Sequence, residues 1–108
     1  MPKYLFQWSY TSGAWAALVK NPENRIEVVR KVIENLGGKL ECAYITFGDY
    51  DGMAVMEMPD NVSVAAFAIS TASGGSLKNI KTTTLMSFEE AIDAMKKAGG
   101  SGYTSLGN

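Results

Sequence analysis

The sequence predicts a two-layer α+β domain of the ferredoxin-like type, with helices on one face of a four-stranded antiparallel sheet. Strand-like and helical stretches follow one another in the order β-α-β-β-α-β, and a further helix comes last. With 108 residues, of which 46% are hydrophobic, the chain can form one core but not two. We therefore expect a single domain over residues 1–98 and a flexible C-terminal tail over residues 99–108.

The first strand is predicted over Lys3–Tyr10, where the aromatic side chains fall on alternate positions. A short helix follows, capped by Thr11 or Ser12, and Pro22 interrupts it. Because proline suits a first helical turn, we expect the helix to resume there and to run to Leu36.

Two further strands are predicted over Lys39–Phe47 and Gly52–Met58, and the glycines and aspartates between them are typical of a hairpin loop. A helix is expected to begin at the turn formed by Pro59, Asp60 and Asn61. Small alanines on its apolar face permit a close approach to the sheet. That face is predicted to consist of Val62, Ala65, Ala66, Ile69 and Ala72.

The fourth strand is predicted over Ser76–Met86. Ser87 and Glu90 then form the pattern of a capping box, in which each side chain satisfies a backbone N–H of the other residue. The last helix has acidic residues at its start and lysines at its end, as the helix dipole favours. Its apolar face consists of Phe88, Ala91, Ile92 and Met95.

Both faces of the predicted sheet carry apolar side chains. In the second strand, Leu40, Cys42 and Tyr44 are expected on one face, and Ala43, Ile45 and Phe47 on the other. Helices cover one face only, and monomers rarely expose a large apolar surface. We therefore expect a homodimer joined through the open sheet faces, which can assemble further into a higher oligomer.

Composition excludes several classes of function. The formal charge is −1, with no basic stripe for nucleic acid, and no run approaches the roughly 20 apolar residues of a membrane span. The absence of histidine removes the commonest general base and metal ligand, so we expect no metal and no cofactor. A single cysteine, Cys42, and the lack of a secretion signal predict a cytoplasmic protein.

Several short stretches, in the same order, resemble the GYD-domain family, a small bacterial family named for a Gly-Tyr-Asp type of loop. They are Lys3–Phe6, Ser9–Thr11, Leu36–Glu41, Phe47–Asp51, Pro59–Asn61, and Thr82–Leu85 ahead of Glu89 and Glu90. The resemblance extends from Lys3 to about Met95, although Thr84 and Phe88 stand where relatives are expected to have proline. It implies the fold of the dimeric α+β barrel group. It implies no catalytic residue, because the family has no settled activity.

The candidate site residues are aromatic and acidic. Asp49 and Asp51 flank Tyr50, and a partly buried pair of carboxylates would raise one pKa and supply a general acid or base. Alternatively, the aspartates of this turn bond to backbone amides. The row that includes Trp8 and Tyr10 either lines an apolar pocket or packs in the core or dimer interface. Tyr10, Tyr44 and Tyr50 are the expected polar contacts to a ligand.

Three functions are compatible with these features. We expect a homodimeric binding or accessory module for a small, partly aromatic metabolite. The alternative is a cofactor-independent isomerase, lyase or monooxygenase that uses Asp49 or Asp51 with a tyrosine. The third is a structural protein whose open sheet face binds another protein. Fold alone does not choose among them.

Overall fold

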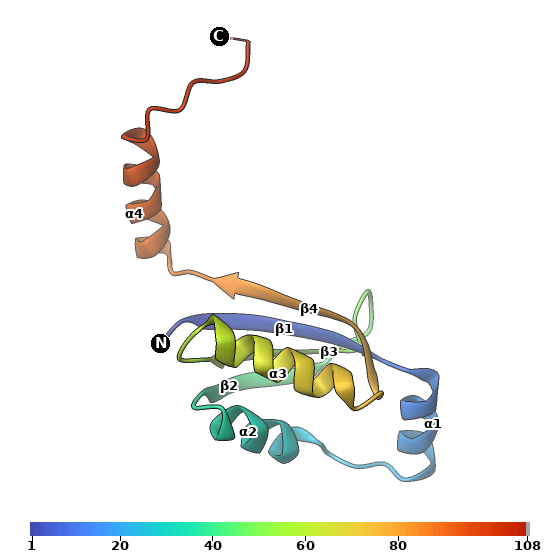
Figure 1. The fold of residues 1–108 in the computed structure, drawn as a ribbon. Helices are drawn as coiled ribbons and strands as arrows, with labels where there is room; N and C mark the ends of the chain where they lie inside the picture. Colours follow the sequence, from blue (N-terminus) through green and yellow to red (C-terminus); the bar gives the residue numbers. More distant parts are fainter. Residues whose placement is uncertain (108) are drawn as a thin grey trace.

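The computed structural model describes residues 1–107 and contains four strands and four helices (Figure 1). The segment between the first two strands divides into two helices, and the rest follows the expected order. The elements are β1 (Lys3–Tyr10), α1 (Ser12–Lys20), α2 (Ile26–Asn35), β2 (Lys39–Ile45), β3 (Gly52–Glu57), α3 (Asn61–Ser73), β4 (Leu77–Leu85) and α4 (Phe88–Gly99).

The four strands form one antiparallel sheet in the order β2-β3-β1-β4. The central strand β1 therefore pairs with β3 on one side and with β4 on the other. Leu5 in β1 marks the register, since it lies opposite Val55 of β3 and Thr83 of β4. This is the strand order of the ferredoxin-like arrangement that the sequence predicts.

The core lies between the sheet and the pair α2 and α3. The aromatic residues Tyr4, Phe6 and Trp8 of β1 are buried on the helix-covered face. Phe6 meets Phe67 of α3 edge to face, with ring centroids 4.9 Å apart. Ile33 contributes from α2 and is fully buried. Lys3, Leu5 and the other alternate residues of β1 point to the open face.

A β-bulge in β2 changes the assignment of its faces. The register shifts between Leu40 and Cys42, so Leu40 pairs with Met56 whereas Cys42 pairs with Val55. Leu40 is consequently buried under the helices, while Cys42 lies on the open face. The expectation that Leu40 shares a face with Cys42 and Tyr44 is wrong, because the bulge inserts a residue that simple alternation does not allow for.

The buried face of α3 also differs from the prediction. Val64 and Phe67 are buried, whereas Val62 is 78% exposed and Ile69 is 68% exposed. The helix is apolar on nearly all sides, so its periodicity favours no single face. The large Phe67 ring packs into the core, and the stripe that contains Val62 and Ile69 faces outward.

The second helix begins later than expected. Residues 21–25 are not helical, and α2 starts at Ile26, whose N–H donates to the Asn24 side chain over 3.0 Å. Arg25 is thus the last residue of the linking segment, and Pro22 lies in that segment rather than in a first helical turn. The strands end within two residues of their predicted bounds.

The last helix projects away from the rest of the fold (Figure 1). Its capping box is present as predicted, with Ser87 and Glu90 each bonding the backbone of the other. The radius of gyration is 17.6 Å, whereas a compact chain of this length has about 13 Å. No helix within residues 1–107 is both long and apolar enough to cross a membrane.

Candidate functional site

A partly open cleft of about 760 Å³ lies at the end of the sheet where β1 meets α1. Its walls come from β1, α1, the 21–25 segment, the start of α2, β2 and the loop after β2. The lining residues are Trp8, Tyr10, Trp15, Leu18, Val19, Pro22, Glu23, Asn24, Arg25, Ile26, Val29, Ala43, Tyr44, Ile45 and Phe47. Most of these side chains are apolar, so the cleft is suited to an apolar ligand.

Three aromatic rings form one wall of the cleft. Tyr10 meets Trp15 edge to face at 4.9 Å between centroids, and it meets Trp8 in the same way at 6.4 Å. Trp8 lies directly against Gly52, where an added Cβ would be 2.2 Å from the indole ring. Glycine at position 52 therefore leaves the space that the Trp8 ring occupies.

Asp51 holds this aromatic wall together. Its Oδ2 accepts hydrogen bonds from the Tyr10 backbone N–H over 2.9 Å and from the Trp15 indole N–H over 3.3 Å. The Asp51 N–H in turn donates to the Trp8 carbonyl over 2.8 Å. A single carboxylate thus ties the β2–β3 loop to the end of β1 and to α1. These bonds are those of an aspartate that fixes a turn.

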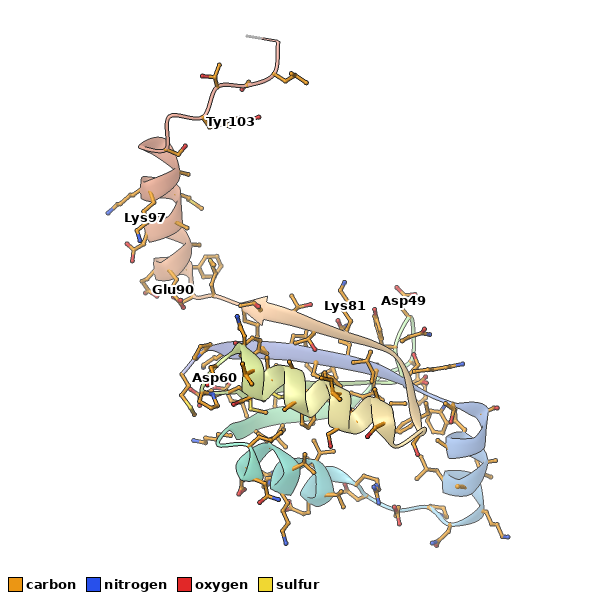
Figure 2. All side chains as sticks on the ribbon, in the orientation of Figure 1. Asp49, Asp60, Lys81, Glu90, Lys97 and Tyr103 are labelled. Atoms are coloured by element: carbon orange, nitrogen blue, oxygen red, sulfur yellow. The ribbon has the colours of Figure 1, made fainter. Side chains whose placement is uncertain are left out.

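The other residues of this loop lie apart from the cleft. Asp49 is exposed at the tip of the loop (Figure 2). The Tyr50 carbonyl accepts the Thr46 hydroxyl proton over 2.7 Å, and Tyr50 is only half-buried. The structure therefore brings Trp8, Tyr10 and Tyr44 into the lining, with Asp51 behind them, and leaves Asp49 and Tyr50 outside.

Glu23 and Arg25 are the charged residues of the lining. They form an ion pair with each other over 3.0 Å, and both side chains are about half exposed. Ion pairs of this exposure contribute little to stability. A polar group of a ligand at the mouth of the cleft can therefore take the place of either side chain in the ion pair.

The Trp8 indole N–H is buried and has no hydrogen-bond partner among the described residues. Unpaired buried donors are uncommon, because each costs free energy of desolvation. The pKa of Lys3 is raised by its bond to Glu41 on the open sheet face, and Asp60 lies at the start of α3.

A second cavity of about 450 Å³ lies between α1, α2 and α3. It shares Trp8, Tyr10 and Arg25 with the first, so the two cavities adjoin. No group of three or more Cys, Asp or Glu side chains within residues 1–107 comes together as metal ligands would.

Sequence reasoning missed several residues of the lining. Trp15 and Leu18 belong to the short helix predicted after the first strand, for which no ligand role is predicted, and Phe47 is predicted as part of a strand. Phe47 is 92% exposed in the loop beyond β2. One signal was available, since Trp15 follows the aromatic strand by only a few residues and is itself aromatic.

Comparison with known proteins supports the resemblance found in the sequence. Residues 4–95 match the GYD domain. The chain belongs to the GYD-domain family. A Thermus thermophilus protein named glutamine synthetase and cystathionine beta-lyase binding protein is 32% identical over 80 residues, which cover 74% of this chain and 84% of that protein.

Two solved structures share the fold of this GYD-domain protein. The crystal structure of FFRP-DM1 matches with a TM-score of 0.50 at 14% identity, covering 80% of this chain and all of the other. The hypothetical protein PHS023 from Pyrococcus horikoshii matches with a TM-score of 0.51 at 12% identity, covering 81% and 92%. At this identity the similarity concerns the fold alone, and it confirms the predicted ferredoxin-like α+β fold of the single chain.

Proposed function

We propose that this GYD-domain protein is an accessory protein that binds a small, largely apolar and partly aromatic metabolite in the cleft beside Trp8 and Tyr10. The observation that carries the proposal is the cleft itself. Its volume of about 760 Å³ falls within the range of small-molecule sites, and its walls are mostly apolar and aromatic.

The chemistry of the walls suggests how such a ligand would lie. An aromatic ring would pack against Tyr10 and Trp15, whose edge-to-face geometry is favourable for a further ring. A polar end would reach the ion pair of Glu23 and Arg25 at the mouth.

Intrinsic fluorescence offers a direct test, because both tryptophans of the chain line the cleft. We expect at least one of a panel of small aromatic compounds, including indole and benzoate, to change this fluorescence saturably. Replacing Ala43 by leucine places a larger side chain in the lining and should weaken binding about tenfold or more. Ala94→Leu, on the exposed side of α4, is the matched control and should leave binding unchanged. Equal binding by the two variants would contradict the proposal.

We also propose that the protein forms a homodimer through the open sheet face. Leu5, Val55 and Cys42 lie in one cross-strand row on that face and are only partly covered. Val55→Lys should therefore shift the protein toward smaller species in sedimentation velocity. Thr84→Lys, which places the same charge on the other face of the sheet, should not. A wild-type protein that remains monomeric at about 100 µM would contradict the dimer.

The accessory role takes support from the Thermus thermophilus relative, whose name describes a protein that binds glutamine synthetase and cystathionine beta-lyase. We propose that this chain likewise binds a glutamine synthetase or a cystathionine beta-lyase, in the cytoplasm. Purified enzyme from the same cells should co-migrate with this protein in size-exclusion chromatography. Independent migration of both enzymes at micromolar concentrations would rule out this partnership.

The enzymatic alternative would use Asp49 or Asp51 with a tyrosine. No contact among residues 1–107 favours it, because Asp51 already accepts two hydrogen bonds and Asp49 lies at the exposed loop tip. It remains distinguishable by experiment, since an enzyme would convert the bound compound and a binding module would return it unchanged. Mass analysis of the compound after incubation separates the two functions.

A further inference from the structure

The outward face of α3 carries no charge and is largely apolar. No residue of the helix is acidic or basic, and Val62 and Ile69 are 78% and 68% exposed. Ala65 and Ala72 lie on the same exposed side, three positions from these residues. Helices with apolar residues on most sides are normally buried, so the exposure of this outward face of α3 is unusual.

The last helix, α4, differs from α3 in that its apolar face is narrow and charged residues lie on either side of it. Phe88, Ile92 and Met95 follow helical spacing and are 89%, 49% and 68% exposed. The charged residues lie to the other sides, among them the labelled Glu90 and Lys97 (Figure 2). A helix of 12 residues is marginal in water by itself, and most helices gain their stability from packing of the apolar face.

We propose that these two faces bind each other between copies of this chain, so that α4 of one copy packs along α3 of another. Within one copy they cannot meet, because α4 projects from the end of β4 away from α3 (Figure 1). The two helices have 13 and 12 residues and therefore matching lengths of about 20 and 18 Å. Alanines on the α3 face allow the backbones to approach closely.

The amount of surface favours a reciprocal pair. Covering one large apolar side chain removes on the order of 100 Å² from water. Each α3–α4 contact covers Val62, Ile69, Phe88, Ile92 and Met95. Two such contacts, related by a two-fold axis, cover on the order of 1,000 Å², which is about the minimum area of a biological interface.

This contact rests on the self-association proposed above and does not depend on the cleft. It adds a second interface to the one through the sheet faces. The two interfaces can be told apart, since Val55→Lys alters only the open sheet face, whereas variants of α3 and α4 leave that face intact.

Charged substitutions in the full chain test the contact. Ile69→Lys on α3 and Ile92→Lys on α4 should each raise the dissociation constant of the assembly about tenfold or more, measured by sedimentation equilibrium. Asp93→Lys, one position further on and away from the apolar face, is the matched control and should have little effect. Ile69 and Ile92 are already exposed, so neither substitution should unfold the protein. An unchanged dissociation constant in both variants would overturn the proposal.

Mixing variants tests whether α3 meets α4 rather than its own counterpart. In a mixed pair of Ile69→Lys and Ile92→Asp copies, one contact is unaltered and the other joins opposite charges. In a pair of Ile69→Lys and Ile92→Lys copies, the altered contact joins like charges. Native mass spectrometry, with one copy labelled with ¹⁵N, should therefore show more mixed dimer in the first mixture. Equal amounts would mean that α3 and α4 do not face each other, and would refute the proposal.

Discussion

Removal of the Asp51 carboxylate should loosen the cleft and destabilise the whole domain. In Asp51→Ala, the Tyr10 and Trp15 N–H groups lose their shared acceptor. A hydrogen bond to a charged group contributes about 1.5–3 kcal/mol, and the 3.3 Å bond from Trp15 is long enough to contribute less. The expected loss in the free energy of unfolding is therefore about 3 kcal/mol.

Asparagine at position 51 distinguishes the contribution of the hydrogen bonds from that of the charge, because it keeps an acceptor oxygen but is neutral. Its side-chain oxygen can occupy the place of Oδ2 and accept the same two N–H groups. Asp51→Asn should therefore cost only about 1 kcal/mol, since neutral acceptors bind more weakly than carboxylates. Urea unfolding at 25 °C, followed by circular dichroism, measures both variants under the same conditions.

A double-mutant cycle with Trp15→Phe isolates the bond to α1. Phenylalanine keeps an aromatic ring against Tyr10 but has no N–H, so the coupling free energy between positions 15 and 51 should be about 1 kcal/mol. A coupling near zero, or equal losses for Asp51→Ala and Asp51→Asn, would refute the role given to Asp51. In the enzymatic alternative, Asp51→Asn would abolish turnover with this same small change in stability.

Three further substitutions test other parts of the structure. Gly52→Ala should lower the free energy of unfolding in urea by about 1–3 kcal/mol, because the new methyl group displaces Trp8. A variant as stable as wild type would show that the Trp8 ring is not confined by position 52. The pKa of Asp60 lies below its ordinary value of 3.8 because the carboxylate accepts the Ser63 backbone N–H. The stabilisation that the ionised Asp60 carboxylate provides is thus complete above pH 3.8 and is lost as the pH falls through the lowered pKa. NMR titration and acid unfolding should show this loss in wild type but not in Asp60→Asn. Ser87→Ala should weaken α4 by about 1 kcal/mol, seen as faster amide exchange in α4 with no change in the urea midpoint of the body. A lowered midpoint would mean that α4 contributes to the body.

Local signals in the sequence were sufficient for the elements and for most of their ends. Alternating aromatics fixed β1, and the Ser87–Glu90 capping box fixed the start of α4, because both depend on near neighbours in the chain. The element order and short connections then left the ferredoxin-like arrangement as the natural topology. Nothing local specified the bulge at Leu40 and Cys42, which depends on how β2 meets β3.

Other features depend on packing that periodicity does not encode. In α3 apolar residues are spread around the helix and none of its residues is charged, so only the three-dimensional fit of Phe67 decides which side is buried. The cleft is assembled from segments as distant as Trp15 and Phe47, and aromatic strand residues are as common in cores as in sites. The sequence therefore identified Trp8, Tyr10 and Tyr44 as candidates without showing what encloses them. The expected tail over residues 99–108 stays a prediction, and its last residue lies outside the described residues.

The central claim is that the cleft beside Trp8 is a ligand site, and the two indole N–H signals of the protein test it most directly. They can be followed in a ¹⁵N correlation spectrum while the tightest-binding compound of the aromatic panel is added. We expect saturable shifts of both indole signals and of lining residues such as Val29 and Ala43, with little change in α4. Shifts that gather on α4 or on the open sheet face, with both indole signals unmoved, would contradict it.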